Sequence, residues 1–90
     1  MASMFEWDAD NREHIKEHGF TQEDAEEAWL DINNLPADAT PVEGEWRQAI
    51  IGMTHDLRLV HVVWTERGDL VRLFEARKPT PREARLYFRR

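Results

Sequence analysis

The sequence predicts an α+β fold, in which a small antiparallel sheet of three to four main strands is combined with two N-terminal helices and one C-terminal helix. Two observations support this class. Apolar residues recur at helical spacing near both ends of the chain, whereas the period falls to two between residues 46 and 77. Turn-like residues divide that middle part into segments of strand length. We expect residues 1–90 to form one domain, because a chain of this length holds a single small core.

The first 19 residues are predicted to form a short strand and a helix. Phe5–Trp7 has the composition of a strand, and either Asp8 or Asp10 can cap the helix that follows. Gly19 is expected to stop this helix. One face of the helix is expected to carry Asn11, His14, Ile15 and His18.

A second amphipathic helix is predicted to begin at Thr21. Thr21 and Asp24 have the spacing of a capping box with a short carboxylate. The apolar stripe of this helix is expected to consist of Ala25, Ala28, Trp29 and Ile32. Its acidic first turns are favoured by the helix dipole and predict no partner. The segment 35–45 is expected to be a loop or a weak edge strand.

Three consecutive antiparallel strands are predicted at residues 46–53, 57–66 and 69–77. The middle strand alternates apolar residues on both faces and is therefore expected at the centre of the sheet. A final helix is predicted from Pro81, because Thr80 can cap it and Glu83 completes a capping box. This helix is expected to place Ala84, Tyr87 and Phe88 toward the sheet and Arg82, Arg85 and Arg89 outward.

Charge is distributed unevenly along the chain. The net charge is −6, yet residues 58–90 carry nine basic and four acidic side chains, a local charge of +5. Phosphate binding is therefore expected to be local and confined to one side of the molecule. The absence of cysteine excludes disulfides and thiolate ligands, and no apolar run reaches the length of a membrane span. We expect a cytoplasmic protein that makes no membrane contact.

Histidines and arginines are the candidates for chemistry. His14 and His18 have the i, i+4 spacing of a zinc pair, but a third ligand would have to come from His55, His61 or a distant carboxylate. We therefore rank a metalloenzyme third among the functions considered, and expect neither metal nor cofactor. The alternative interpretation is that both histidines flank the buried Ile15 without binding metal.

Arginine forks can hold phosphate oxygens by two-point contacts. Arg67, Arg72 and Arg77 are expected on adjacent strands. Since Arg72 and Arg77 are five residues apart, they face opposite sides of their strand unless a bulge intervenes. Arg77 is the preferred phosphate ligand of the two. Its alternative role is an ion pair with a carboxylate at the rim of the sheet, for which the candidates are Glu45, Glu75 and Glu83.

The order of motifs resembles the BrnT toxins of type II toxin–antitoxin systems, which are small ribonucleases with a RelE-like fold. The resemblance covers nearly the whole chain. Matching elements are Trp7-Asp8, Gly44-Glu45-x-Arg47, and a C-terminal block of Thr65, Arg67, Gly68, Asp69, Arg72, Ala76, Arg77, Glu83 and Tyr87. It implies an mRNA-cleaving toxin that is neutralised by a BrnA-type antitoxin, and contact with DNA only through that antitoxin.

The resemblance breaks at two positions near the first helix. The BrnT motif has lysine before His-Gly and asparagine three residues earlier, where this chain has Glu17 and His14. The anionic Glu17 therefore stands where the motif has a cationic lysine. This exchange supports the second hypothesis, a catalytically inactive, toxin-like module that binds another protein.

Metal-free RNA cleavage of the RelE type uses the ribose 2′-hydroxyl to attack the adjacent phosphate. Arginine stays protonated at neutral pH and cannot accept the proton, so we expect His18 to act as the base. Arg67 and Arg77 are expected to hold the phosphate, and Tyr87 to stack on or hydrogen-bond a nucleotide. Further RNA contacts are expected from Arg47, Arg72, Arg82 and Arg85.

Overall fold

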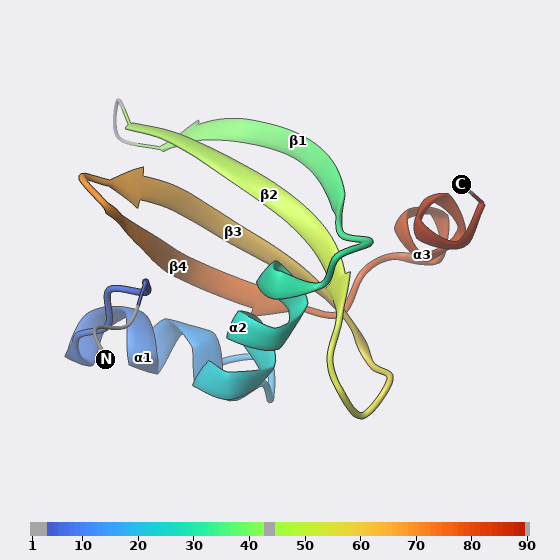
Figure 1. Ribbon diagram of the computed structural model, residues 1–90, viewed down its shortest axis with the longest axis horizontal. Coiled ribbons are helices and arrows are strands. Elements are labelled where there is room, and N and C mark those ends of the chain that lie inside the picture. The colour runs from blue at the N-terminus through green and yellow to red at the C-terminus, as the bar shows by residue number, and fades with distance from the viewer. Residues whose placement is uncertain (1–3, 43–44, 90) are drawn as a thin grey trace.

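The α+β architecture is confirmed by a computed structural model, which describes residues 4–42 and 45–89, and the side chains outside 39–46. Four antiparallel strands form one sheet in the order β1-β2-β3-β4 (Figure 1). Two helices precede the sheet and one follows it. The elements are α1 (Ala9–Lys16), α2 (Gln22–Leu30), β1 (Leu35–Val42), β2 (Glu45–Met53), β3 (Leu59–Arg67), β4 (Leu70–Arg77) and α3 (Pro81–Phe88).

Each helix begins with a complete capping box. Thr21 accepts a hydrogen bond from the Asp24 backbone N–H, and the Asp24 carboxylate accepts one from the Thr21 N–H. Asp8 and Thr80 start α1 and α3 in the same way, with Asn11 and Glu83 as their respective partners. These reciprocal bonds satisfy N–H groups that the helix itself leaves unpaired, which explains why short helices start at these residues.

Two of the predicted helix ends are wrong. Helix α1 ends at Lys16, and residues 17–19 form a turn in which Gly19 has a φ of +85°. His18 therefore lies outside the helix and does not share a helical face with His14. Helix α2 ends at Leu30, and the side chain of Ile32 is 95% exposed instead of completing the apolar stripe.

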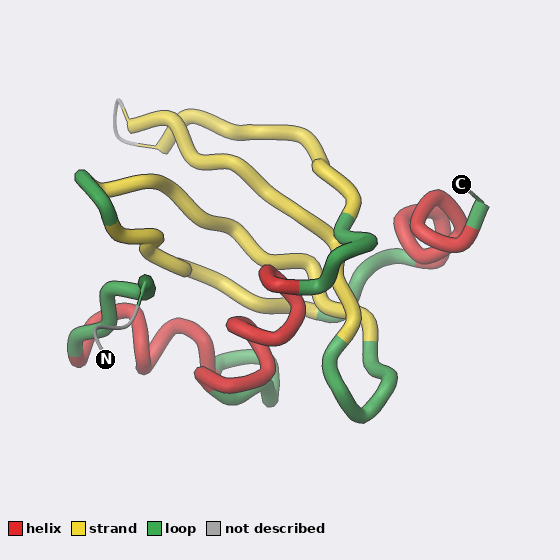
Figure 2. The backbone as a smooth tube through the Cα atoms, in the orientation of Figure 1, coloured by secondary structure: helices red, strands yellow, loops and turns green. Residues whose placement is uncertain are grey.

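The three main strands follow the predicted order, and the two segments predicted as weaker or shorter strands lie at the edges of the sheet. The segment 35–45 contributes edge strand β1, which pairs with β2 and shifts register between Ala37 and Thr40. The short strand predicted at Phe5–Trp7 is reduced to one parallel bridge between Phe5 and Val71 at the β4 edge. Figure 2 shows that the N-terminal segment runs beside β4, so the sheet has a fifth, minimal partner there.

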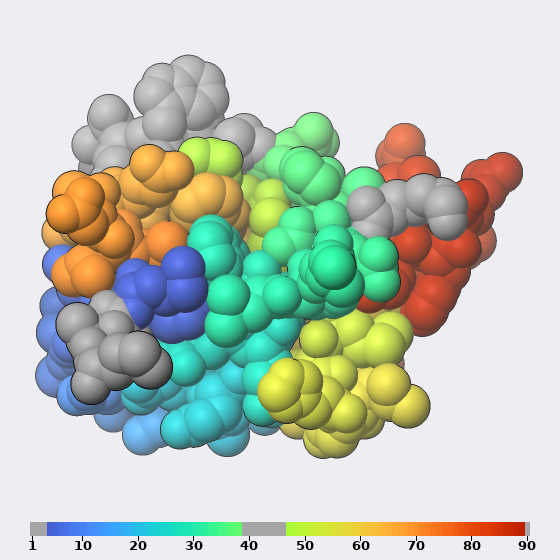
Figure 3. All heavy atoms as spheres, in the orientation of Figure 1, coloured from blue at the N-terminus to red at the C-terminus, as the bar shows by residue number. Residues whose placement is uncertain are grey.

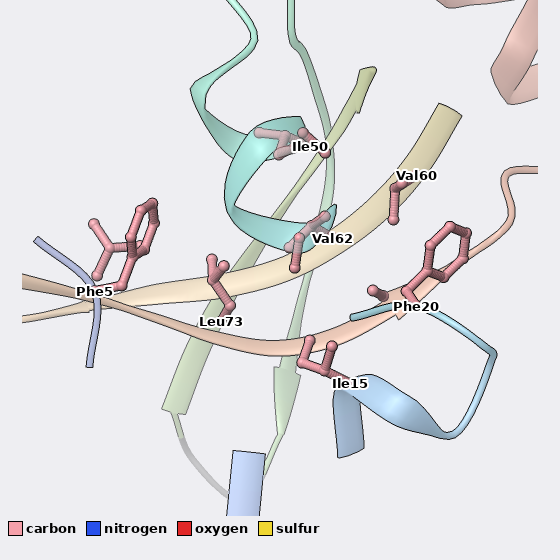
Figure 4. Packing of buried hydrophobic residues seen from close by; sticks show 11 residues of the cluster. Phe5, Ile15, Phe20, Ile50, Val60, Val62 and Leu73 are labelled. Atoms are coloured by element: carbon pink, nitrogen blue, oxygen red, sulfur yellow. The ribbon is translucent and has the colours of Figure 1, made fainter. Parts of the chain in front are cut away.

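The hydrophobic core lies between one face of the sheet and helices α1 and α2 (Figure 4). Ile15 and Leu73 are fully buried members of this core, and burying each such side chain stabilises the fold by about 1.5–3 kcal/mol. The core residues of the sheet are Ile50, Val60, Val62, Val71, Leu73 and Ala76. Because side chains alternate along a strand, the residues between them point to the opposite face.

Helix α3 lies apart from this core, beyond one end of the strands (Figure 1). None of its residues is buried, and Phe88, which was expected to face the sheet, is 64% exposed. Ala84 and Tyr87 are half-buried. Among the described helices, none is both long and apolar enough to cross a membrane.

Candidate active site on the open face of the sheet

A groove of about 910 Å³ lies on the face of the sheet that α1 and α2 leave open. Its floor comes from β2, β3 and β4, and its walls come from α1, β1 and α3. Its polar lining includes Arg47, His61, Glu75, Arg77, Arg82 and Glu83. We refer to this feature as the groove.

A β-bulge determines which side chains of β4 reach the groove. Val63 pairs with Glu75 while the next residue of β3, Trp64, pairs with Leu73, so Phe74 is an additional residue in β4. The extra residue changes the parity of the strand. Arg72 and Arg77 therefore lie on the same face, although five residues separate them.

Arg77 and Glu83 form a two-point ion pair at the end of the groove. Arg77 Nη1 lies 2.9 Å from Glu83 Oε1, and Nη2 lies 3.1 Å from Oε2. Glu83 also accepts a hydrogen bond from the backbone N–H of Thr80. The hydrogen bonds from Arg77, followed by the one from Thr80, lower the pKa of Glu83 to about 2. Glu83 is therefore an anion at every physiological pH.

The Arg77 guanidinium retains donors that no described residue uses. Nη1 and Nη2 each donate a hydrogen bond to the Glu83 carboxylate, and Nη1 donates a second hydrogen bond to the carbonyl of Lys78. Guanidinium has five N–H donors in a planar fork. The edge formed by Nε and the remaining Nη2 hydrogen is available for a second two-point contact.

His61 lies directly across from Arg77 in the register of β3 and β4. The residue is 8% exposed, and its Nε2 lies 3.8 Å from Glu83 Oε2. Burial, and then the charge of Arg77, lower the pKa of His61 below its ordinary value of 6.5. The imidazole is therefore neutral at pH 7 and competent to accept a proton.

Two further cations of the groove have no ion pair among the described residues. The Arg47 guanidinium lies 3.8 Å from the ring centre of Phe74, a cation–π contact that holds it on the floor of the groove. Arg82 is exposed on α3. Neither guanidinium has a carboxylate partner in the described part of the chain, so both can meet an incoming anion.

The histidines of the N-terminal region lie at the rim of the groove. His18 Nε2 is 3.8 Å from Glu75 Oε1, and the His14 side chain is 3.7 Å from Glu17. Both histidines are about half exposed. Within the described residues, no three potential ligands are close enough together to hold a metal ion.

Arg67 and Arg72 lie away from Arg77. Arg72 is 6% exposed, and its guanidinium lies 3.0 Å from both Glu6 and Asp8. These hydrogen bonds lower the pKa of Asp8. Along β3, Arg67 lies six residues from His61, the partner of Arg77, which corresponds to about 20 Å. Arg67 and Arg77, which were expected to hold the phosphate together, are therefore far apart on the sheet.

The remaining predicted site residues belong to α3. The Tyr87 hydroxyl donates a hydrogen bond to Asp31 Oδ2 over 2.5 Å and so connects α3 to the end of α2. Arg85 is exposed on the same helix. Of the predicted residues, Arg47, Arg77 and Arg82 line the groove, His18 reaches it through Glu75, and the others lie outside its lining.

His61 was considered from the sequence only as a possible third metal ligand. It is the polar residue within the apolar run of residues 59–64, a pattern that indicates a buried polar site. Glu83 was predicted to complete a capping box and was one of three candidate ion-pair partners of Arg77, and its carboxylate serves both the cap and Arg77. No local pattern selects Glu83 among those candidates, since the choice depends on how α3 is placed.

A comparison with protein families identifies the family of this chain. The family model described as the ribonuclease toxin BrnT of type II toxin–antitoxin systems matches residues 7–83. The matched span includes Arg47, His61, Arg77 and Glu83. No curated protein matches the chain.

Proposed function

Because this chain belongs to the BrnT family of ribonuclease toxins of type II toxin–antitoxin systems, we propose that it is a metal-independent endoribonuclease that cleaves mRNA in the groove. The observation that carries the proposal is the pairing of two groups on adjacent strands. Arg77 offers a free edge for a phosphate, and His61 is a neutral base directly across from it. Family membership supplies the substrate class, and this geometry supplies the residues.

The proposed step is an intramolecular transfer at phosphorus. The ribose 2′-oxygen attacks the adjacent phosphorus as its proton moves to His61, and the bond from phosphorus to the 5′-oxygen breaks. The 5′-oxygen takes a proton from water, which leaves a 2′,3′-cyclic phosphate and a 5′-hydroxyl. Arg77 stabilises the charge that accumulates on the non-bridging oxygens. Glu83 keeps Arg77 in place and stabilises the imidazolium that forms on His61.

His61 replaces His18 as the proposed proton acceptor. His18 is half exposed in a turn and reaches the groove only through Glu75, whereas His61 lies across from the phosphate ligand. Arg47 and Arg82 are proposed to bind neighbouring phosphates of the RNA. We place His18 at the rim, where it can contact the RNA strand as it leaves the groove.

The purified chain tests this proposal directly. We expect it to cleave single-stranded RNA in the presence of EDTA and to produce cyclic phosphate ends. Arg77→Ala should lower the cleavage rate by at least about 100-fold, because it removes the donors that meet the developing charge. The matched control is Arg12→Ala on the exposed side of α1, which should cleave at the normal rate.

Circular dichroism should show that both variants are folded. RNA that stays intact at high enzyme concentration and long incubation would refute the nuclease, as would equal rates for Arg77→Ala and the unmodified chain.

A second candidate is a toxin-like protein-binding module without catalysis. The observation in its favour is that carboxylates already occupy Arg72 and one end of Arg77, while Glu17 stands where the family motif has a cation. Expression without a partner separates the two functions. A nuclease arrests growth, and its Arg77→Ala variant does not, whereas a binding module leaves growth unchanged in both forms.

The partner of a type II toxin is an antitoxin. We propose that here it is a BrnA-type protein, that DNA is contacted only through it, and that both proteins act in the cytoplasm. Co-purification with the product of the neighbouring gene tests the pairing, and failure to recover a complex after co-expression would contradict it.

A further inference from the structure

The end of the molecule formed by α3 and the last turn of α2 exposes apolar side chains together with unpaired cations. Four apolar residues there are largely exposed: Leu30 (55%), Ile32 (95%), Leu86 (45%) and Phe88 (64%). The exposed arginines of the same end are Arg82, Arg85 and Arg89. We call this set of seven residues the C-terminal face.

The two halves of the C-terminal face are held next to each other. Tyr87 donates a hydrogen bond to Asp31, and these two residues are the chain neighbours of Phe88 and Ile32. The Tyr87 and Phe88 rings also meet edge to face at 5.2 Å. Figure 3 shows the atoms of α3 adjoining those of the segment that follows α2.

The charges of this face call for an acidic partner. No ion pair of the described residues involves its three arginines, and the only carboxylate of α3, Glu83, is bound to Arg77. Aliphatic side chains such as Leu30 and Ile32 cannot stack on bases, so burying them favours a protein over RNA. The occupant indicated is an amphipathic segment with apolar and acidic residues.

We propose that the C-terminal face is the docking site of an acidic amphipathic segment of the antitoxin. This inference rests on the antitoxin partner of the proposed function. Leu86 and Arg82 belong both to this face and to the wall of the groove. A segment bound here covers the end of the groove next to Arg77, and so blocks RNA without entering the catalytic centre.

The test measures antitoxin affinity and RNA cleavage in the same set of variants. The antitoxin is the product of the gene next to that of the toxin, purified and titrated against the full chain. The double variant Ile32→Ser with Phe88→Ser should weaken the Kd by about 10–100-fold, because truncating central apolar contacts has effects of this size. Arg89→Glu should weaken it by about 5–10-fold and make the remaining binding less sensitive to salt.

A matched control is Leu57→Ser, which truncates a 77% exposed leucine in the turn between β2 and β3. It should leave the Kd unchanged. All of the substituted side chains are exposed, so the variants should fold normally, and their RNA cleavage without antitoxin should equal that of the unmodified chain. Antitoxin should inhibit the double variant only at correspondingly higher concentration.

Unchanged antitoxin affinity of the double variant would overturn the inference. The inference would also be overturned if these variants lost RNA cleavage but kept their antitoxin affinity, because the C-terminal face would then bind RNA. The nuclease proposal can fail on its own. If the unmodified chain cleaves no RNA but the Ile32 and Phe88 substitutions weaken antitoxin binding, the docking site is supported and the catalytic site is refuted.

Discussion

At the scale of single residues, the chemistry that we propose for the groove depends on one buried imidazole. His61 is kept neutral by burial and by the nearby charge of Arg77, and the Glu83 carboxylate opposes this only in part. A base whose pKa lies below 6.5 is mostly unprotonated at pH 7 and can accept a proton. The same shift means that His61 favours folding above pH 6.5, and that this contribution is lost as the pH falls through its folded pKa.

The pH dependence of cleavage tests this assignment. We expect kcat/KM to be constant around pH 7 and to fall only below pH 6.5, where His61 becomes protonated. His61→Asn should lower kcat/KM by about 10²–10⁴-fold and abolish this acid limb. His55→Asn, in an exposed turn, is the control and should leave the profile unchanged. An acid limb that persists in His61→Asn assigns the proton acceptor to another group.

Asn11 is a second residue whose burial determines how much its substitution destabilises the fold. It is 1% exposed, and its amide donates hydrogen bonds of 3.0 Å to the carbonyls of Glu6 and Leu73 while its oxygen caps α1. Asn11→Ala should lower the free energy of unfolding by about 2–4 kcal/mol, because it leaves buried carbonyls unpaired. Urea denaturation measures this loss. Asn33→Ala, on the surface, should change it by less than about 0.5 kcal/mol.

At the scale of elements, the distance between α2 and the sheet is set by a glycine. A Cβ atom on Gly52 would lie 1.9 Å from the carbonyl oxygen of Ala28, which belongs to the backbone of α2. Since backbone cannot rotate away as a side chain can, the helix has to shift. The close approach allows Ala28 and Ile50 to be fully enclosed.

Substitution of this glycine should therefore act through packing. Gly52→Ala should lower the free energy of unfolding by about 3 kcal/mol. Gly19→Ala is the contrasting control, because Gly19 has open space around it and a φ of +85°, so only conformational strain of about 1 kcal/mol is expected. Chemical denaturation of both variants measures the difference, and equal losses would show that α2 adjusts without cost.

At the scale of the whole molecule, a net-acidic body carries a groove whose described lining holds three arginines beside four carboxylates. Most carboxylates lie in the N-terminal part of the chain, and several of them bind arginines that are then unavailable to RNA, such as Arg58 and Arg72. Long-range attraction of RNA is therefore weak. Binding must depend on a few local contacts, for which the groove offers Arg47, Arg77 and Arg82.

The salt dependence of RNA binding follows from this small number. Each phosphate contact on a single strand contributes about −0.7 to the slope of log K against log salt, so three contacts predict a slope of about −2. Arg82→Ala should make it shallower by about 0.7. Fluorescence anisotropy with an oligonucleotide that lacks the 2′-hydroxyl measures the slope without cleavage. A slope steeper than about −5 would place additional arginines in the interface.

Features encoded by neighbouring residues were determined by the sequence alone. The helix starts at Thr21 and Thr80 follow from capping boxes four residues long, and the three strands from Trp46 onward follow from an apolar period of two. The family resemblance likewise depends on motifs read in order along the chain. Each of these signals lies within a short segment and is unaffected by how the segments later pack.

The composition of the groove was decided only by the tertiary structure. The bulge at Phe74 reverses the parity from which Arg72 and Arg77 were expected on opposite faces, because register depends on pairing with β3. The order of residues likewise does not show that α1 ends before His18. It offered several carboxylates as partners of Arg77, and only the structure selects Glu83 and places it beside His61. A charged side chain selects its partner by distance after folding, so the sequence determined the elements and the structure determined which charges meet.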